Sequence, residues 1–592
     1  MKQKTLKQIY GSVVVLLLLA VYSGYVVRFL DPSEFCAPIT KCVFVLGRPE
    51  TWLPWIAAMH PSLAFVAGLL GISVGLWRLI RERSLSPIER WGLITGITTL
   101  LLQGLQTFWF GNKLRDYSDL THLSLGLLAL TAFTVAGLSV LPSFQVLSDA
   151  RSSKRKYVRF LGMGLLWVTF LLLISGYAQG LDPYSPACGG WPFCSSGWAF
   201  SQWGWHILLH RLLSLLALGG VTGMLIITWR GYSQDIIVLP AATALAILFL
   251  GQVGLGGVMV NRGYRQDLVA LHAFNIVALW LTLSVLVFRV WVRSPHSERQ
   301  SIATVSWQTR LKAYFLLNKP VIVALLLVTT YTGMVLAAKG IPDARLTFWT
   351  LFGGALAAGG ASAINQYIDR EADKRMQRTA KRPIPAGIIT PAQGLAYGIA
   401  ACWVAFFMLA IMVNLLTALL ALAGMIYYVG IYSLWLKPAT PQNIVIGGGA
   451  GAIPPLVGWA AVANDLQVPA LFLFAIIFLW TPPHFWALAL VRRKDYARAG
   501  IPMLPVVLGE QTTRRQIFIY TLQLVALTLL MPLLNLTGHL FLLIALVLGG
   551  GLIYAAWRVL RMPGNRPAYQ MYRMSSMYLA LIFLALVVDV LV

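Results

Sequence analysis

The chain consists largely of apolar runs whose length matches the thickness of a membrane's hydrocarbon core. A membrane-spanning helix needs about 20 predominantly apolar residues, and eight such runs precede Arg293 while nine follow it. The sequence therefore predicts an all-α polytopic membrane protein with about 17 transmembrane helices. The predicted spans lie roughly at residues 11–30, 55–77, 92–110, 120–141, 160–181, 205–229, 238–260, 268–290, 320–338, 347–367, 394–413, 415–434, 444–463, 469–490, 515–535, 540–558 and 574–592.

Composition supports the membrane class. Of the 592 residues, 58% are hydrophobic and 11% are charged, whereas a soluble chain has about 25% charged residues. So few charges cannot coat several soluble domains, and the high apolar content excludes a disordered chain or a disulfide-rich secreted scaffold.

The excess of basic residues is a topology signal. The 46 Lys and Arg residues outnumber the 20 Asp and Glu residues, which gives a net charge of +26. The basic residues cluster in alternate connections between the apolar runs, for example at 151–159, which is the positive-inside pattern. We therefore expect a multi-pass protein of the cell's inner (plasma) membrane with its N-terminus in the cytoplasm, its C-terminus outside and no nucleic-acid partner. No small-residue cleavage site follows the apolar run at 13–27, so we expect no cleavable signal peptide.

A polar, basic stretch divides the chain into two predicted domains. Residues 294–319 are long enough to be a cytoplasmic linker, and the motifs before and after them differ. We expect one membrane domain at 1–293 and a second, nine-helix bundle at 320–592.

The first predicted domain repeats itself. His60 and His122 are 62 residues apart, as are His210 and His272, and the two pairs are offset by 150 residues. A C-x5-C spacing also occurs twice, at an offset of 152, and a Gln precedes the second His of each pair by 19 or 20 residues. Several independent pairs at one offset indicate an internal duplication. The domain is predicted to be two four-helix bundles, at about 11–141 and 160–290.

The duplicated cysteines fall in predicted outward loops. Paired cysteines outside the membrane lie where disulfides persist, so a disulfide in each loop is favoured over reduced, buried thiols, and a catalytic dithiol stays open. The four are Cys36, Cys42, Cys188 and Cys194. Cys402 lies inside a predicted span and is interpreted as a packing residue.

The four duplicated histidines are candidate haem ligands. Ionisable residues inside a membrane span are costly and usually functional, and each of these lies near the outer end of its span. Two imidazoles that face each other across a four-helix bundle suit a bis-His haem. A hydrogen-bonded structural role is the alternative, and zinc is disfavoured because no cysteine or carboxylate joins them.

Several stretches of this domain resemble haem A synthase: His210–Arg211, QVGLGGVMV from Gln252 to Val260, and LHAFN around His272. The duplicated architecture and the outer-loop cysteines are similar as well, over about residues 8 to 292. The resemblance implies that His210 and His272 ligate a haem b cofactor. It also implies that His60 and His122 bracket a haem o substrate, one ring methyl of which is oxidised to a formyl group.

Two positions depart from that family's pattern. Ala57 stands where the family has a Glu that is thought to be catalytic, and Pro61 replaces its Arg. Glu50 is the nearest acid and lies seven residues too early to replace it by simple register. The resemblance therefore supports haem binding more directly than oxidation. His206, one turn before His210, is interpreted as polar packing or a contact to the haem edge.

The second predicted domain contains a row of side chains whose oxygen atoms could bind a metal ion. Asn365, Asp369 and Asp373 are spaced i, i+4 and i+8, so they line one face of a helix, and Arg378, Lys381 and Arg382 follow. Carboxylates hold Mg²⁺, the metal bridges a diphosphate, and basic residues neutralise the remaining charge. A solvated helix end would explain the mixed charge but not this register. The stretch is not accompanied by a glycine-rich phosphate-binding loop, which argues against a nucleotide as the ligand.

The same motif resembles the intramembrane (UbiA-type) prenyltransferases. The stretches YSLWLK from Tyr432, GGGAGAIPPLVGW from Gly447, TPPHFWALAL from Thr481 and KDYARAGIPMLPVVLG from Lys494 narrow it to haem O synthase (protohaem IX farnesyltransferase), over about residues 310 to 592. NKP at Asn318–Pro320 also fits, although Val321 stands where the family has Arg.

This resemblance implies that farnesyl diphosphate ionises and that a vinyl group of haem b captures the allylic cation. Mg²⁺ would be held by Asn365, Asp369 and Asp373, with help to the diphosphate from Arg378, Arg382 and Lys437. Asp495 is a candidate for a second Mg²⁺ or orders its loop, and Tyr496 lies beside it. His484 either contacts the haem acceptor or makes a hydrogen bond at the Pro482–Pro483 kink.

Together the two resemblances imply consecutive steps of haem a biosynthesis on one chain, in which haem b becomes haem o and haem o becomes haem a. The implied partners are the lipid bilayer, an electron donor and the assembly of a haem-copper oxidase. Three alternatives stay open: a prenyltransferase fused to a bis-His di-haem cytochrome b, a quinone or chlorophyll prenyltransferase, and a transporter.

Overall fold

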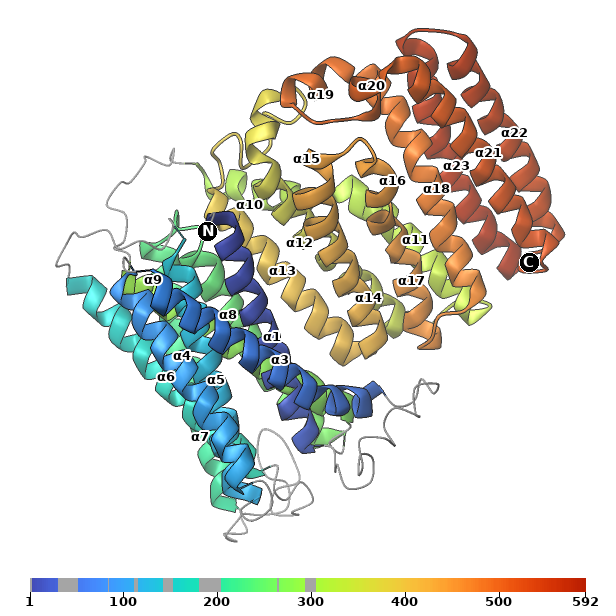
Figure 1. Ribbon diagram of the computed structural model, residues 1–592. Helices are drawn as coiled ribbons and strands as arrows, with labels where there is room; N and C mark the ends of the chain where they lie inside the picture. Colours follow the sequence, from blue (N-terminus) through green and yellow to red (C-terminus); the bar gives the residue numbers. More distant parts are fainter. Residues whose placement is uncertain are drawn as a thin grey trace. The chain divides into compact units, whose positions relative to one another are not determined.

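In the computed structural model every regular element of the described residues is helical, which confirms the predicted all-α membrane class. The structure describes residues 3–29, 52–82, 85–110, 115–141, 153–179, 204–262, 266–292 and 305–592. Within those ranges, sixteen helices are long and apolar enough to cross a membrane, and the predicted span at 92–110 lies in a further helix, α4. The chain forms two compact units, Met1–Ser297 and Glu298–Val592 (Figure 1).

The first unit contains two sets of four helices that pack in the same way. In the first set α1 packs against α3 and α5, and α4 against α5; in the second set α6 packs against α7 and α9, and α8 against α9. The first set is α1 (Gln3–Phe29), α3 (Trp52–Arg81), α4 (Pro87–Phe110) and α5 (Arg115–Ser139). The second set is α6 (Ser153–Gln179), α7 (Gly204–Gly231), α8 (Val238–Asn261) and α9 (Gln266–Val292). The two sets therefore share one pattern of helix contacts.

A buried ionic cluster joins three helices of the first set. The guanidinium of Arg78 in α3 donates from Nε and Nη2 to Glu89 Oε1 in α4, at 3.0 and 2.6 Å. The hydroxyl of Tyr10 in α1 donates to the same oxygen at 2.9 Å. All three side chains are buried, and a buried charge is tolerated only when it is paired and hydrogen-bonded. The cluster therefore fixes the relative positions of α1, α3 and α4.

The second unit begins inside the stretch that was expected to be a linker. Residues 307–317 form α10 (Trp307–Leu317), which Ser306 caps by accepting a hydrogen bond from the Thr309 amide at 3.3 Å. Its apolar face packs against α12 and buries Ala313 and Leu317. The helices that follow are α11 (Pro320–Ala338), α12 (Ala344–Arg375), α13 (Pro391–Met412), α14 (Leu415–Ile426), η4 (Tyr427–Leu436), α15 (Lys437–Ala439), α16 (Asn443–Gly447), α17 (Gly449–Ala463), α18 (Val468–Val491), α19 (Arg493–Ala499), α20 (Leu504–Val507), α21 (Gly509–Leu533), α22 (His539–Arg561) and α23 (Asn565–Leu591). Of these, α21, α22 and α23 lie side by side (Figure 1).

Two glycines bring α11 and α17 into backbone contact. A Cβ atom added to Gly458 would overlap the carbonyl oxygen of Thr330, and one added to Gly333 would overlap that of Pro455. Small residues allow such close approach of helices in a membrane, where packing rather than hydrophobicity drives association. This contact sets the position of α11, whose first turn borders the polar cluster described below.

Alanine at the close contact should destabilise the second unit. Gly458→Ala forces the helices apart, and overpacking of this kind costs about 1–3 kcal/mol, so we expect a lower thermal unfolding temperature in detergent. Gly451→Ala on the same helix is the control, because a Cβ there meets nothing within 4 Å. Equal unfolding temperatures for the two variants would contradict the close contact.

Candidate functional sites

The predicted row of oxygen ligands lies on the last turns of α12. Asn365, Asp369 and Asp373 are only 3%, 8% and 4% exposed. Because their spacing is close to one helical turn, they form a single row, and the Asn365 amide donates to Asp369 Oδ2 at 2.9 Å. Two carboxylates this deeply buried need partners of opposite charge.

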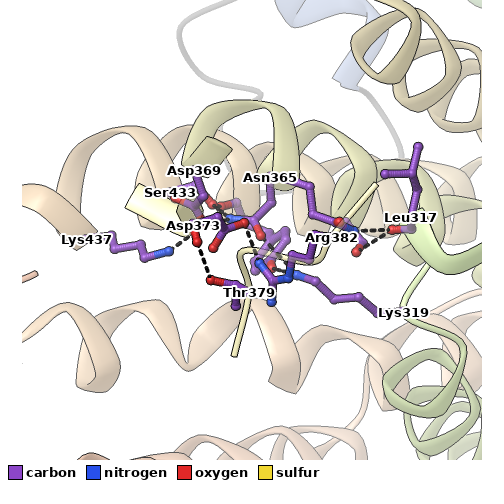
Figure 2. A network of polar contacts seen from close by, with 12 residues as sticks. Leu317, Lys319, Asn365, Asp369, Asp373, Thr379, Arg382, Ser433 and Lys437 are labelled. Carbon is purple, nitrogen blue, oxygen red and sulfur yellow. Dashed lines mark hydrogen bonds and ion pairs between the residues drawn. The ribbon is translucent and has the colours of Figure 1, made fainter. Parts of the chain in front are cut away.

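Each carboxylate of the row is paired with a cation from another segment. Lys437, at the start of α15, forms an ion pair with Asp369. Arg382, in the loop after α12, donates to Asp373 Oδ2 at 2.7 Å. Figure 2 shows Lys437 and Lys319 approaching the Asn365–Asp369 pair from opposite sides. The sequence motif thus meets Lys437 and Arg382, two of the three basic residues that the resemblance had associated with it.

Lys319 is a site residue that sequence reasoning missed. Its ammonium donates to Asn365 Oδ1 at 3.0 Å and to the Tyr428 hydroxyl at 3.3 Å. Burial is the main cause that lowers the pKa of the Lys319 ammonium to about 8, and the positive charge of Arg382 acts in the same direction. The ammonium is therefore mostly charged at neutral pH. Lys319 lies inside the NKP stretch, but its direction depends on a left-handed backbone (φ 50°) just before α11. Such strain in a non-glycine residue is uncommon and clusters at functional sites.

A π-helix brings a second unpredicted residue, Ser433, to the row. The element η4 spans ten residues, and within it Ser433 donates to the Tyr428 carbonyl at 2.8 Å. Its oxygen accepts from the Asn365 amide at 3.0 Å. π-Helical segments are rare and often occur at functional sites. Ser433 lies in the YSLWLK stretch, but the usual helical period does not predict the geometry that brings it to the row.

The remaining predicted basic and acidic residues lie around this cluster at differing depth. Arg378 is exposed and makes no hydrogen bond or ion pair among the described residues. Burial raises the pKa of the Tyr496 phenol, and the positive charges of Arg378 and Arg382 act in the opposite direction, so they lie near it. Asp495, on α19, is 9% exposed and lies 3.8 Å from Arg498 and 4.0 Å from Arg492. The structure thus gives Asp495 ion-pair partners on or beside its own short helix.

His484 lies in an aromatic pocket between α18 and α23. Its ring stacks on Trp480 with ring centres 4.2 Å apart, and the Tyr572 ring is 4.6 Å away. Nδ1 makes a 2.9 Å hydrogen bond with the Ser575 hydroxyl of α23. The hydrogen bond therefore crosses to a neighbouring helix, and Nε2 has no partner among the described residues.

The α12 row is suited to a hard divalent cation. Carboxylate and carboxamide oxygens are the ligands that Mg²⁺ prefers, and Mg²⁺ usually takes only one or two carboxylates and completes its shell with water and phosphate oxygens. Within the described residues no group of three or more His, Cys, Asp or Glu side chains could hold a metal. Asp369 and Asp373 with Asn365 are therefore a partial ligand set.

In the first unit, His60 of α3 faces His122 of α5. Their ring centres are 6.1 Å apart and their planes meet at 73°. Two imidazoles on opposite sides of one metal ion, each bonded at about 2 Å, have ring centres about 6 Å apart. The spacing fits an iron held between them. The side-chain amide nitrogen of Gln103 lies 3.1 Å from His122 Nε2.

The second pair, His210 of α7 and His272 of α9, is close enough to interact electrostatically. The side-chain amide nitrogen of Gln252 lies 2.8 Å from His272 Nε2, and Asn275 Nδ2 donates to Gln252 Oε1 at 2.6 Å. Nδ1 of His272 is buried without a hydrogen-bond partner. Buried polar atoms are rarely left unpaired, so this nitrogen fits a site that takes a ligand.

Some predicted residues lie outside the described part of the chain. They are Cys36, Cys42, Cys188, Cys194, Glu50 and the side chains of Ala57 and His206. Cys402 is described and is a free thiol within α13.

The profile of the UbiA prenyltransferase family matches residues 326–582. A protoheme IX farnesyltransferase from Roseiflexus sp. (strain RS-1) is 38% identical over 559 residues, which cover 91% of this chain and 97% of that protein. A second, from Chloroflexus aurantiacus, is 35% identical over 595 residues, 97% of each chain. A third, from Gloeobacter violaceus, is 52% identical over 280 residues, which cover 47% of this chain and 92% of that protein. The two longer relatives extend over both units, whereas the third matches about half of the chain.

Proposed function

This chain belongs to the protoheme IX farnesyltransferase family of UbiA-type prenyltransferases, and we propose on that basis that its second unit transfers a farnesyl group to haem b. The observation that carries the proposal is the buried row of Asn365, Asp369 and Asp373 with cations directed at it. Anionic ligands and cations held together at the end of a membrane helix suit a metal-bound diphosphate. The product of the transfer is haem o.

Asn365, Asp369 and Asp373 would hold Mg²⁺, which neutralises the diphosphate and stabilises it as a leaving group. Lys437 and Lys319 are already within contact of the row, and Arg382 is bonded to Asp373. If Mg²⁺ bound the carboxylates, Lys437, Lys319 and Arg382 would be positioned to bind phosphate oxygens. Asp495 is proposed as a ligand of a second Mg²⁺, with Arg378 and Tyr496 on the same side of the diphosphate.

The transfer is a substitution at the first carbon of the farnesyl chain. The bond between that carbon and the diphosphate oxygen breaks, and its electron pair leaves with the diphosphate. The vinyl group of haem b then supplies the electron pair for a new carbon–carbon bond. Water adds to the resulting cation next to the ring and loses a proton, which gives a hydroxyethylfarnesyl substituent. The buried site keeps other water from the allylic cation.

The aromatic pocket of His484 is proposed to contact the haem acceptor. Trp480 and Tyr572 offer flat apolar faces beside it, and flat aromatic rings suit a porphyrin. Ser575 holds the His484 ring at Nδ1, so Nε2 is the atom that would face the acceptor.

Removing one carboxylate of the row should impair metal-dependent transfer. For Asp369→Asn we expect kcat/KM to fall about 100-fold and the half-saturating Mg²⁺ concentration to rise, because losing a charged ligand costs several kcal/mol. The assay follows haem o formation in detergent across a Mg²⁺ titration.

Asp343→Asn on the same helix is the matched control. Asp343 caps the other end of α12 by accepting from the Leu346 amide at 2.8 Å, and Asn caps helices about as well as Asp. Equal Mg²⁺ dependence of both variants would contradict the proposed metal site.

The role of Lys319 can be tested with a lysine at the other end of the same helix. Lys319→Met should raise KM for farnesyl diphosphate or lower kcat, by about 10- to 100-fold in kcat/KM, because one charge-assisted contact is lost. Lys339→Met is the control, since Lys339 has the same left-handed backbone (φ 50°) but is exposed. Similar kinetics for both variants would remove Lys319 from the diphosphate site.

For the first unit we propose oxidation of a haem o ring methyl to the formyl group of haem a. The support is the pair of opposed histidines, His60 with His122, and the duplicated pair His210 with His272. His210 and His272 would hold a haem b cofactor, which carries electrons to the reaction, and the first pair would hold haem o. Two successive hydroxylations by dioxygen, each consuming two electrons and two protons, give a hydrate that loses water. An electron donor is therefore a required partner, and a haem-copper oxidase is the proposed destination of haem a.

A second candidate function for the first unit is electron transfer by two permanent haem b groups. The observation that favours it is Ala57, since no acid stands where the haem A synthase pattern has its Glu.

The proposed cellular location is the same for both functions: the inner (plasma) membrane, with the N-terminus cytoplasmic and the C-terminus outside.

Haem extraction from a host that lacks both activities separates the two candidates. With this chain expressed, chromatography with mass detection should show haem a, together with one tightly bound haem b in the purified protein. Haem o without haem a, and two tightly bound haem b groups, would instead support the electron-transfer function. The absence of both haem o and haem a would contradict the farnesyl transfer.

A further inference from the structure

A Ser-Gly pair occurs at the same place in both halves of the first unit. Ser23–Gly24 lie on α1 and Ser175–Gly176 on α6, at an offset of 152 residues. Each pair packs against the first histidine of its set, His60 in α3 or His210 in α7. The histidine spacing alone does not reveal these partners.

In the first half the hydrogen bonds determine which imidazole nitrogen carries the proton. The Ser23 hydroxyl donates to the carbonyl of Ala20 at 3.0 Å, so its hydrogen is already used. His60 Nδ1 lies 3.0 Å from that carbonyl oxygen and 3.1 Å from Ser23 Oγ. A carbonyl only accepts hydrogen bonds, so Nδ1 must be the donor. The lone pair of the neutral ring is therefore on Nε2.

The second half repeats this arrangement. Ser175 Oγ donates to the Leu172 carbonyl at 3.1 Å and lies 2.9 Å from His210 Nδ1. The Ser175 hydrogen is therefore already used, so Nδ1 of His210 is the donor in the contact with Ser175 Oγ. The same reasoning places the proton on Nδ1 and the lone pair on Nε2.

The glycine of each pair makes room for the imidazole. A Cβ on Gly24 would lie 2.6 Å from His60 Cε1, and one on Gly176 would lie 3.2 Å from His210 Cε1. Real Cβ atoms essentially never approach as closely as the first distance. The ring is thus held by hydrogen bonds at Nδ1 and by close contact with the glycine, which leaves no space for a Cβ at Gly24 and little at Gly176.

We propose that Ser23–Gly24 and Ser175–Gly176 are positioning pairs that hold His60 and His210 as the Nδ1-protonated tautomer, with Nε2 as the atom that ligates haem iron. The inference rests on the proposed haem binding by the first unit. A histidine ligand commonly donates its other ring N–H to a carbonyl or similar acceptor, which fixes the ring and raises its basicity as a ligand. A more basic ligand stabilises ferric iron and lowers the reduction potential of the haem.

The decisive experiment is an optical redox titration of the purified full chain carrying Ser175→Ala. Nδ1–H then loses its serine acceptor, so the midpoint potential of the haem at His210 should rise, and haem retention should fall about 10-fold. Ser175→Thr keeps the hydroxyl and should restore both values. Ser214→Ala is the control, because Ser214 bonds the His210 backbone carbonyl at 2.8 Å and not its ring.

Gly24 and Gly176 provide an independent test, in which the alanine variants should differ in the size of their effect. Gly24→Ala should perturb haem binding at its pair more than Gly176→Ala does at the other, because the added Cβ is closer to the ring. Gly11→Ala on α1 and Gly164→Ala on α6 are the controls, since a Cβ at either position meets nothing within 4 Å. The readouts are bound haem per chain and the optical spectrum.

Failure of this inference and failure of the proposed haem binding look different. If His210→Ala removes a haem but Ser175→Ala leaves the midpoint potential unchanged, the positioning role is wrong and haem ligation stands. If His210→Ala leaves haem content and spectrum as in the unaltered chain, haem ligation by His210 is wrong and the inference falls with it.

Discussion

The second unit's site depends on the pairing of charges that are buried at the end of a membrane helix. Asp369 and Asp373 are almost inaccessible, and an unpaired charge at that depth is prohibitively costly. Lys437 and Arg382 meet this requirement from two segments that follow α12 in the chain. The site therefore holds these two cations in place beside the carboxylates. Under the proposed function, a metal ion bound by the carboxylates would leave the same cations available for phosphate oxygens.

The sequence predicts those parts of the site that depend only on regular helix geometry. The row could be predicted from helix formation alone, because a spacing of about one turn aligns its side chains whatever packs against them. Its members are Asn365, Asp369 and Asp373. Lys319 and Ser433 could not be predicted in the same way. One depends on a left-handed residue before α11 and the other on a π-helix, and neither conformation has a reliable sequence signal. The helix at residues 307–317 has no clear signal in the sequence either, because its buried face is short and forms only against residues far along the chain, such as Ile384 and Ile389.

The first unit shows the complementary case, in which repetition in the sequence carries more information than any single residue. The spacing of the four histidines predicted two equivalent four-helix sets, and the described helices pack in matching ways. Which atoms touch each ring was beyond the sequence, since the contact of Ser23 with His60 depends on the rotation of α1 against α3. The halves also differ where the repeat alone suggests identity: Asn275 bonds Gln252, whereas Leu125 stands at the matching position of the first half.

The presence of both units on one chain has a physical argument of its own. The relative from Gloeobacter violaceus matches about half of this chain over 92% of its own length, and the family profile lies within the second unit. The two longer relatives nevertheless extend over both units. Under the proposed function the product of the second unit is a haem with a farnesyl tail, which is too apolar to cross water. Tethering a consuming site to the producing site raises its effective concentration for such a product without any new contact. The advantage of the fusion would therefore lie in transfer of the intermediate, and not in the chemistry of either site.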